Sequence, residues 1–374
     1  EEAVAAGLYN VIGKEIDDKY MAELKKQIIH PDVIQEMADD IKIVYTPLCG
    51  TGNKPVRRIL SELGFKHVYV VPEQENPDPN FTTLDYPNPE DPKAFTYALR
   101  LAKEKDADIV LATDPDADRL GVYAKDTKTG EYVAFTGNMS GMLIAEYILR
   151  EKTATGTMPE NPALVTTIVT TNMTKPITEA YGVKLIEVLT GFKFIGEQIG
   201  KLEKQGKADS YVFGFEESYG YLTGSYVRDK DGVDGAYMIC EMFSYYATKG
   251  ISLLDKLDEL YKTYGYCLNT LHSYEFDGSA GFAKMQSIMQ VFRGDIKEFG
   301  GKKVVKLLDY APGLDGLPKS DVLKFLLEDN CSIVVRPSGT EPKLKTYISV
   351  SAENKEAAEK IESEICKSAE EFLK

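Results

Sequence analysis

Histidine is scarce in this chain of 374 residues, which has only three, and cysteine is little more common, with five. With so few imidazoles a histidine-rich metal centre is excluded, so the chemistry has to rest on carboxylates, lysines, arginines and backbone amides. The cysteines are scattered and form no CxxC pair. This favours the reduced thiols of a cytoplasmic protein over a disulfide framework or a zinc site.

Long apolar runs and an excess of positive charge are also missing. No stretch approaches the roughly 18 consecutive apolar residues of a membrane span, so we expect no membrane partner. The net charge of −15 argues against a general nucleic-acid surface, although a local cluster of cations could still bind a phosphate. The start, Glu1-Glu2-Ala3-Val4, has neither an initiating Met nor a signal pattern, and we expect the chain to be part of something longer.

The order of strand and helix patterns predicts several domains, because 374 residues exceed one ordinary core. Alternating strands and helices predict two successive mixed or parallel α/β sheet domains, at residues 1–155 and 156–265. A smaller α+β domain is expected at 266–374. Strands are expected in the α/β part at 41–45, 68–71, 109–112, 164–169, 184–188 and 211–213. Ligands of such sheets gather beyond the carboxyl ends of the strands.

The most informative loop is the acidic segment that follows the strand at 109–112. Asp114, Asp116 and Asp118 occupy alternate positions and would point to one side of an extended segment, followed by Arg119. Three carboxylates this close repel one another unless a cation lies among them, and hard oxygen ligands suit Mg²⁺. A solvated acidic turn is the plainer alternative. An EF-hand is excluded, because the required Gly and terminal Glu are missing.

Three further loops carry groups suited to a phosphorylated sugar. Gly214 to Tyr221 offers carboxylates and a hydroxyl to vicinal hydroxyls, Tyr226 to Gly232 supplies cations, and Arg336 to Lys343 combines an arginine, two hydroxyls and a lysine in a plausible phosphate cradle. It is not a Walker loop, since the GxxxxGK spacing is missing. Taken singly, each could be an ordinary surface turn or hairpin. Thr190-Gly191-Phe192-Lys193 could likewise be a simple connection.

Together and in this order, the loops resemble the α-D-phosphohexomutase family, which includes phosphoglucomutases and phosphomannomutases. The shared motifs are the Asp-x-Asp-x-Asp-Arg loop, the Glu-x-Ser sugar loop and the Arg-x-Ser-Gly-Thr phosphate loop. The resemblance covers nearly the whole chain and implies domains two, three and four of that family. It implies a reaction in which a phosphoserine of domain one passes its phosphoryl group to a hexose phosphate, through a bisphosphate such as glucose 1,6-bisphosphate.

The resemblance also implies a role for each matching residue. Mg²⁺ would bind Asp114, Asp116 and Asp118, and Arg119 would orient the phosphoryl group. Lys230 is the candidate general acid or base. The residues implied in substrate binding are Thr190, Gly191, Lys193, Glu216, Ser218, Arg228, Arg336, Ser338, Gly339 and Thr340.

One departure from the family pattern has a direct consequence. No Thr-Ala-Ser-His-Asn-Pro type segment occurs, so the phosphoserine is absent and we expect these 374 residues to be inactive without an N-terminal domain. Glu216-Glu217-Ser218 is the pattern of glucose-preferring members, which implies interconversion of glucose 1-phosphate and glucose 6-phosphate. Mannose or pentose phosphate mutases and sugar-bisphosphate synthases stay open.

Two other classes of protein also stay open. A non-catalytic sugar-phosphate-binding protein would have the same loops. A Mg²⁺-dependent phosphatase with an Asp nucleophile would explain the acidic loop but leave the other loops unexplained.

Overall fold

The computed structural model describes residues 1–338 and 342–373 and divides the chain into two compact units. The first comprises Glu1–Ala134, Leu222–Val227 and Asp231–Gly250, and the second comprises the remaining segments, Phe135–Tyr221, Arg228–Lys230 and Ile251–Lys374. Gly339, Thr340 and Glu341 lie outside the described residues. Among the described residues, every helix is too short or too polar to span a bilayer.

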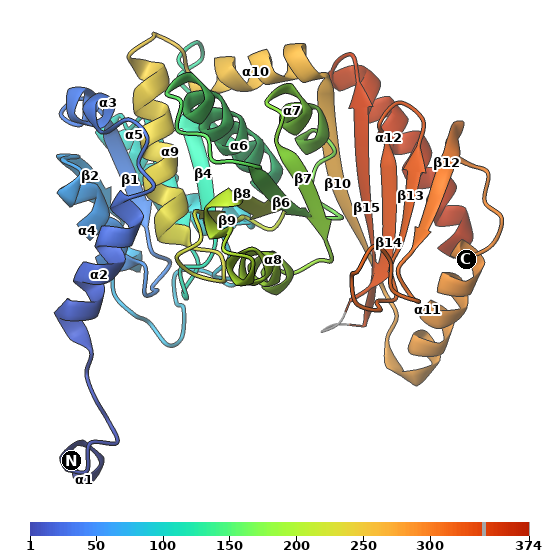
Figure 1. Ribbon diagram of the computed structural model, residues 1–374, viewed down its shortest axis with the longest axis horizontal. Helices are drawn as coiled ribbons and strands as arrows, with labels where there is room; N and C mark the ends of the chain where they lie inside the picture. The colour runs from blue at the N-terminus through green and yellow to red at the C-terminus, as the bar shows by residue number, and fades with distance from the viewer. Residues whose placement is uncertain (339–341, 374) are drawn as a thin grey trace. The chain divides into compact units, whose positions relative to one another are not determined.

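The first unit is built on a five-stranded sheet in the order β2-β1-β3-β4-β5 (Figure 1). Strands β1, β2 and β3 are parallel, and β4 runs antiparallel to β3. Its strands are β1 (Lys42–Thr46), β2 (His67–Val70), β3 (Ile109–Thr113), β4 (Leu120–Lys125) and β5 (Tyr132–Phe135). Its helices are α1 (Glu2–Ala5), α2 (Gly13–Lys25), α3 (Pro31–Met37), α4 (Asn53–Glu62), η1 (Pro72–Gln74), η2 (Pro92–Phe95), α5 (Thr96–Lys105) and α9 (Gly232–Ala247).

Helix α9 joins this unit from far along the sequence. It packs against α3, α4 and β4, whereas α5 packs on β1 and β3. Asp231 precedes the helix and caps it: its carboxylate accepts hydrogen bonds from the backbone N–H groups of Val233 and Asp234 at 2.8 and 3.1 Å. These bonds satisfy donors that have no partner in the first helical turn.

The second unit contains two sheets. The four-stranded sheet has the order β7-β6-β8-β9, with β6 parallel to both β7 and β8. Its elements are α6 (Gly137–Ala154), β6 (Ala163–Thr167), α7 (Thr174–Ala180), β7 (Lys184–Val188), α8 (Phe192–Lys204), η3 (Ala208–Ser210), β8 (Tyr211–Glu216), β9 (Gly220–Thr223) and α10 (Leu253–Tyr264).

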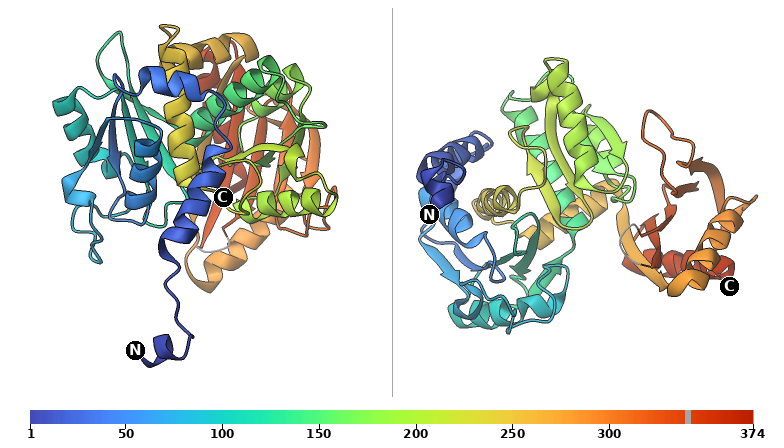
Figure 2. Two further views of the ribbon diagram at one scale, coloured as in Figure 1. Left: turned by 60° about the vertical axis from the view of Figure 1, so that its left-hand side comes forward. Right: turned by 90° about the horizontal axis from the view of Figure 1, so that it is seen from below.

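The C-terminal sheet is six-stranded, in the order β10-β15-β14-β13-β12-β11, and each pair of neighbouring strands is antiparallel. Helices α11 and α12 cover one of its faces (Figure 2). Its elements are β10 (Tyr266–Glu275), α11 (Gly278–Phe292), β11 (Glu298–Phe299), β12 (Lys302–Asp309), β13 (Leu323–Leu327), β14 (Ser332–Pro337), β15 (Lys343–Ala352), α12 (Lys355–Glu370) and η4 (Glu371–Leu373).

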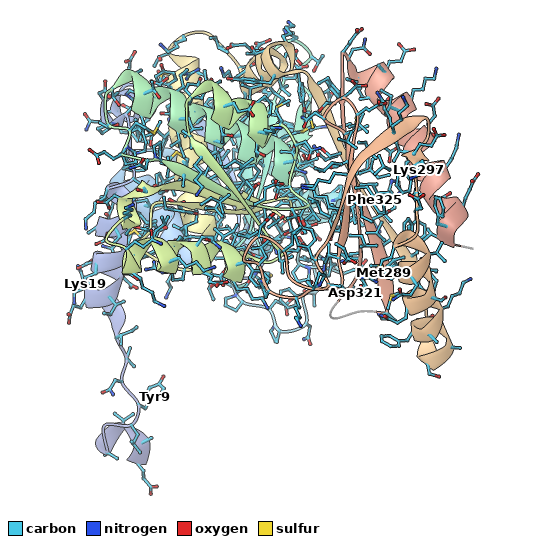
Figure 3. All side chains as sticks on the ribbon, turned by 45° about the vertical axis from the view of Figure 1, so that its right-hand side comes forward. Tyr9, Lys19, Met289, Lys297, Asp321 and Phe325 are labelled. Atoms are coloured by element: carbon cyan, nitrogen blue, oxygen red, sulfur yellow. The ribbon has the colours of Figure 1, made fainter. Side chains whose placement is uncertain are left out.

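Alternation along the strands gives the C-terminal sheet two apolar faces. Ile333 and Val335 of β14 pack with Met289 of α11 and Phe325 of β13 in one core (Figure 3). Val334, the residue between them, points the other way and packs with side chains of the four-stranded part, such as Leu189. The period of two that defines a strand therefore explains how one sheet is covered on both sides.

The predicted fold class is confirmed: two mixed α/β sheet domains precede an antiparallel C-terminal domain. The domain limits at residues 155 and 265 stay a prediction. Helix α6 groups with the residues that follow it, and α9 groups with the first sheet.

Candidate functional site

The acidic segment forms the turn between the antiparallel strands β3 and β4 in the first unit. One carboxylate oxygen from each of Asp114, Asp116 and Asp118 lies within 4.8 Å of the others. The expected extended conformation is wrong, because Ala117 has a positive φ of 59° and the chain turns there. The carboxylates converge because the chain bends around a common point, not because alternate residues share one side of a strand.

The first carboxylate, Asp114, is the most enclosed of the three, with 7% of the residue exposed. Its Oδ1 accepts hydrogen bonds from the backbone N–H groups of Asp118 and Arg119 at 3.1 and 2.9 Å, which fixes the turn. Burial, and then the charges of Asp118 and Asp116, raise the pKa of the Asp114 carboxyl to about 7. Both causes make the charged form of this carboxyl less favourable than it is in water.

Arg119 supplies positive charge at the edge of the turn. Its Nη1 donates to Glu90 Oε1 at 2.7 Å, and its Nε lies 3.6 Å from Asp114 Oδ2. The guanidinium is thus held between two carboxylates beside the acidic turn.

Two glycines allow other segments to pack against the acidic turn. A Cβ on Gly50 would lie 2.3 Å from Pro115 Cα, and the next residue, Thr51, donates its N–H to Pro115 O at 2.8 Å. The N–H of Gly232, at the start of α9, donates to Ala117 O at 2.9 Å. Backbone can approach this closely only where no side chain intervenes.

The predicted sugar loop is the turn between β8 and β9 in the second unit. Glu216 ends β8 and is 4% exposed, Ser218 is half-buried, and Tyr219 has a positive φ of 66°. The start of α6 supports this turn, since a Cβ on Gly137 would lie 2.1 Å from Glu217 O and 2.8 Å from Tyr219 N.

Lys230 lies next to this turn. A Cβ on Gly220 would be 2.4 Å from Lys230 Cδ and 2.9 Å from Glu216 Oε1, so both side chains reach the same glycine. The Lys230 side chain is only 13% exposed, and its Nζ is 3.7 Å from Asp229 Oδ1. The structure therefore brings two of the predicted site residues, Glu216 and Lys230, together.

Thr190, Gly191 and Lys193 connect β7 to α8. Gly191 has φ 114°, a conformation that favours glycine, and stands immediately before the helix. The Thr190 hydroxyl is buried and has no hydrogen-bond partner among the described residues. Lys193 Nζ lies 5.0 Å from the centre of the Phe194 ring. An unsatisfied buried hydroxyl is costly and is typical of a position that a polar ligand completes.

Arg228 contacts helix α8. Its Nη2 donates to Glu203 Oε2 of α8 at 2.7 Å, and a Cβ on Gly196 would lie 2.0 Å from its carbonyl oxygen. This segment is thus fixed against α8, and the role of Arg228 in substrate binding stays a prediction.

Arg336 lies at the end of β14, and Ser338 follows it. The Arg336 guanidinium lies over the Tyr347 ring, 5.5 Å from its centre, and Nη2 donates to the Tyr347 hydroxyl at 3.0 Å. Its Nε is buried and lacks a hydrogen-bond partner in the described part of the chain. The Ser338 N–H donates to Lys343 O at 2.7 Å. Gly339 and Thr340, predicted to complete this loop, lie outside the described residues.

Glu217 and Tyr347 were not among the predicted site residues. Burial and the neighbouring Glu216 raise the pKa of the Glu217 carboxyl to about 7, and its Oε2 accepts from the Thr167 hydroxyl at 3.3 Å. The doubled glutamate was a signal for Glu217. The sequence contained no such signal for Tyr347, because only the pairing of β14 with β15 places its ring beneath Arg336.

Three family models match the chain in sequence. They describe phosphoglucomutase/phosphomannomutase, namely alpha/beta/alpha domain II at residues 18–129, alpha/beta/alpha domain III at 136–264 and the C-terminal domain at 280–368. Two α/β domains followed by an antiparallel domain, with an acidic turn after β3, thus match one class of phosphosugar enzymes. The chain belongs to the phosphoglucomutase/phosphomannomutase family, over domains II to IV.

Individual relatives agree with this assignment. The phosphoglucomutase of Staphylococcus aureus (strain MSSA476) is 36% identical over 365 residues, which cover 94% of this chain and 64% of the relative. The chain therefore spans 64% of the length of this curated relative.

Two solved structures are similar in fold. Paramecium pp63/parafusin, a phosphoglucomutase in its open form, has a TM-score of 0.71 at 19% identity, covering 95% of this chain and 62% of that one. Aspergillus fumigatus N-acetylphosphoglucosamine mutase, solved in complex with GlcNAc-6P and magnesium, has a TM-score of 0.52 at 13% identity, covering 93% and 66%. At these identities the likeness shows the fold alone.

Proposed function

We propose that this chain provides the metal-binding, sugar-binding and phosphate-binding part of a hexose-phosphate mutase, which interconverts glucose 1-phosphate and glucose 6-phosphate. The observation that carries the proposal is the convergence of three aspartates within 4.8 Å in the turn after β3. In a chain that belongs to this enzyme family, such a turn fits phosphoryl transfer, which depends on charge neutralisation and positioning.

The acidic turn fits Mg²⁺ because Asp114, Asp116 and Asp118 offer only hard oxygen ligands. The raised pKa of Asp114 supports this proposal, since part of its cause is the charge of the two neighbouring carboxylates. Bound Mg²⁺ would neutralise charge on a phosphoryl group. Arg119, held beside the turn, would orient that group with its guanidinium.

The second unit would hold the sugar and carry out proton transfer. We assign the sugar hydroxyls to Glu216 and Ser218, with Thr190, Gly191 and Lys193 beside them. Lys230 is our candidate general acid or base, because its side chain is largely buried and reaches the same glycine as Glu216.

The phosphate that does not react would bind at the end of β14. Arg336 supports this assignment with a buried Nε that has no partner among the described residues. Ser338, Gly339 and Thr340 would add hydroxyl and backbone donors, and Arg228 is a further candidate.

A calorimetric titration tests the metal assignment. We expect Mg²⁺ to bind the wild-type chain and Asp116→Ala to weaken binding by about 10-fold or more, because a charged ligand is lost. Asp126→Ala, in the turn after β4, is the matched control and should bind like wild type. Equal Mg²⁺ affinity in wild type and Asp116→Ala would contradict the assignment.

Glucose 1-phosphate binding tests the phosphate loop separately. Arg336→Ala should weaken binding in the same calorimetric assay, because a charged donor is lost, and Arg336→Lys should restore only part of it because lysine lacks the planar fork. Arg100→Ala, an exposed arginine of α5, is the control.

Turnover tests the expected inactivity of these 374 residues by themselves. No serine loop of the phosphoryl-donating type occurs in the sequence, so we expect no conversion of glucose 1-phosphate in the presence of glucose 1,6-bisphosphate and Mg²⁺. Robust turnover by the purified chain would overturn this expectation. The preference for glucose over mannose phosphates, suggested by Glu216-Glu217-Ser218, is tested by comparing kcat/KM for both substrates in a protein that includes the N-terminal domain.

A further inference from the structure

A second group of potential metal ligands lies in the C-terminal domain and includes none of the residues assigned above. It consists of His272 of β10 and Glu362 and Cys366 of α12. One ligand atom from each, an imidazole nitrogen, a carboxylate oxygen and a thiol sulfur, lies within 4.8 Å of the other two. His272 Nε2 and Glu362 Oε1 already form a hydrogen bond of 2.7 Å.

The backbone geometry of both elements directs these side chains at one another. Alternate residues of β10 face α12: the Thr270 hydroxyl donates to Glu362 Oε1 at 2.7 Å, and the Tyr274 hydroxyl donates to Glu370 Oε1 at 3.3 Å. Glu362, Cys366 and Glu370 are spaced four residues apart and therefore form one stripe along the helix. His272 stands between Thr270 and Tyr274 on the strand, opposite that stripe.

The surroundings of the group suit a cation. The Glu362 side chain is 13% exposed and that of His272 is 32% exposed, so both are partly withdrawn from water. Among the described residues, the Glu362 carboxylate contacts the His272 imidazole and the Thr270 hydroxyl, and it contacts no lysine or arginine. Cys366 is the one cysteine of the five that is not fully buried. A carboxylate, with Glu370 nearby, thus gives the group negative charge in a setting that solvent can reach.

We propose that His272, Glu362 and Cys366 form a binding site for a borderline-soft divalent cation, with Zn²⁺ as the best match. Zn²⁺ accepts nitrogen, oxygen and sulfur ligands in a tetrahedral arrangement, whereas Mg²⁺ requires oxygen ligands in an octahedral one. Water or Glu370 would occupy the fourth coordination position; Glu370 Oε1 lies 3.9 Å from Cys366 Sγ. The two metal sites of the chain therefore select different metals.

Coordination changes the protonation of the cysteine. A cysteine thiol ordinarily carries its proton near neutral pH, whereas the metal ligand is the thiolate. Binding forms a sulfur–metal bond and releases the thiol proton to solvent. The hydrogen bond between His272 Nε2 and Glu362 Oε1 is replaced by bonds from both atoms to the metal, and the imidazole then carries its proton on Nδ1. The bound ion would join β10, the first strand of the C-terminal sheet, to α12, the helix that covers it, and so stabilise the folded domain.

The test uses the full, reduced chain, freed of metal and then saturated with Mg²⁺ so that the acidic turn is occupied. Titration with Zn²⁺ should show one ion bound per chain and should raise the midpoint of thermal unfolding. Co²⁺, used as a spectroscopic probe, should give a thiolate-to-metal charge-transfer band. Cys366→Ser should abolish this band and weaken Zn²⁺ binding by about 10- to 100-fold. His272→Gln and Glu362→Gln should weaken Zn²⁺ binding by a similar factor.

Matched controls separate this site from other cation-binding groups. Glu364→Gln, an exposed position of α12, and His67→Gln, in β2, should bind Zn²⁺ like wild type. Asp116→Ala removes a carboxylate of the acidic turn and should leave the Co²⁺ band intact. Urea unfolding without metal shows whether each variant folds, and a variant that does not fold is replaced by Cys366→Ala or His272→Asn.

Two results would overturn the proposal. One is the absence of Zn²⁺ binding to the Mg²⁺-saturated wild type. The other is binding that persists in folded Cys366 and His272 variants or disappears in Asp116→Ala. The assignment of Mg²⁺ to the acidic turn is tested separately, by the Mg²⁺ titration of the wild type and Asp116→Ala.

Discussion

At the scale of single residues, Asp234 shows how burial alone changes an ordinary side chain. It is 0% exposed, and burial followed by the charge of Asp231 raises the pKa of its carboxyl to about 8. Its oxygens accept from the Thr223 backbone N–H at 2.7 Å and the Tyr237 hydroxyl at 2.9 Å. The folded chain therefore holds a proton that the unfolded chain releases near pH 4.

This difference predicts a dependence of stability on pH. Between about pH 4 and pH 8 the unfolded state binds fewer protons at this position, so the free energy of unfolding falls as pH rises, by up to about 1.4 kcal/mol per pH unit. Asp234→Asn does not titrate, so its unfolding free energy should fall less between pH 5 and pH 8 in urea denaturation. Asp126→Asn replaces a carboxyl whose pKa is lowered, mainly by the Lys128 N–H, and should follow wild type in this range. Identical curves for wild type and Asp234→Asn would contradict the prediction.

A second prediction at this scale concerns Gly50 and the affinity for Mg²⁺. Gly50→Ala should weaken Mg²⁺ binding by about 10-fold, because its Cβ would lie 2.3 Å from Pro115 Cα and the acidic turn would have to move. Calorimetry measures the affinity. Gly200→Ala, in α8, has no atom within 4 Å of the new Cβ and should bind Mg²⁺ normally. Unchanged affinity in Gly50→Ala would show that the position of this turn does not matter for the metal.

At the scale of elements, a buried ion pair joins α10 to α6. Lys256 is 1% exposed, and its Nζ lies 3.2 Å from Glu146 Oε2 and 2.9 Å from Glu259 Oε1. Lys256→Met should lower the free energy of unfolding by about 1–3 kcal/mol, because buried Glu146 loses one of its cations while Arg150 Nη1 stays 3.7 Å from Glu146 Oε2. Urea denaturation measures the loss.

The double variant tests the cause of this loss. Adding Glu146→Gln to Lys256→Met should recover part of the stability, since the glutamine is neutral and can still accept from the Tyr181 hydroxyl. Lys262→Met, an exposed position of α10, should change stability by only about 0.5 kcal/mol or less. No recovery in the double variant would count against the lost ion pair between Lys256 and Glu146 as the cause.

Short strands were predictable, and two long buried helices were not. The strands expected at 109–112 and 184–188 occur as β3 and β7. Helices α6 and α9 were missed, because they are buried on most sides and have no polar face to mark their period. Strand β4 was also missed, and with it the fact that the acidic segment is a turn within a hairpin.

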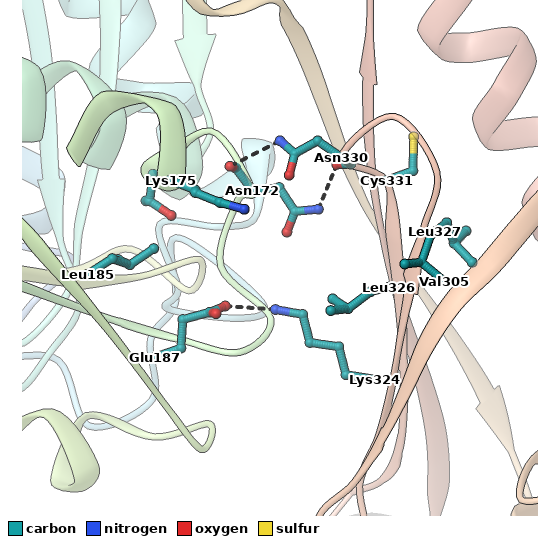
Figure 4. A pocket seen from close by; sticks show the side chains of 11 residues that line it. Asn172, Lys175, Leu185, Glu187, Val305, Lys324, Leu326, Leu327, Asn330 and Cys331 are labelled. Carbon is teal, nitrogen blue, oxygen red and sulfur yellow. Dashed lines mark hydrogen bonds and ion pairs between the residues drawn. The ribbon is translucent and has the colours of Figure 1, made fainter. Parts of the chain in front are cut away.

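At the scale of the molecule, a polar contact links the four-stranded part of the second unit to the C-terminal sheet. Figure 4 shows Lys324 of β13 pointing toward Glu187 of β7, with 2.7 Å between Nζ and Oε1. Nearby, Asn172 Nδ2 donates to Asn330 O at 2.9 Å. The Lys324 side chain is only 4% exposed, so its charge depends on this partner.

Glu187→Ala should therefore lower the free energy of unfolding by about 1–3 kcal/mol, because a buried ammonium loses its acceptor. Glu187→Gln keeps an acceptor and should lose less, and Glu187→Ala combined with Lys324→Met should recover stability. Urea denaturation compares the variants, while Mg²⁺ affinity, which depends on the other unit, should stay at the wild-type value. If the double variant is the least stable of the three, the contact does not act through an unpaired charge.

The sequence by itself determined the family, the order of the domains and the four loops, because loop chemistry is carried by neighbouring residues and survives as motifs. It also led to the expectation of no zinc site, since three histidines and five scattered cysteines give no ligand spacing. Tertiary structure alone decided how the acidic turn bends and that Lys230 meets Glu216 at Gly220. It also decided that His272 faces Cys366, although the two residues are 94 positions apart in the sequence. Such contacts depend on how elements pack, and packing distances leave no trace in local sequence spacing.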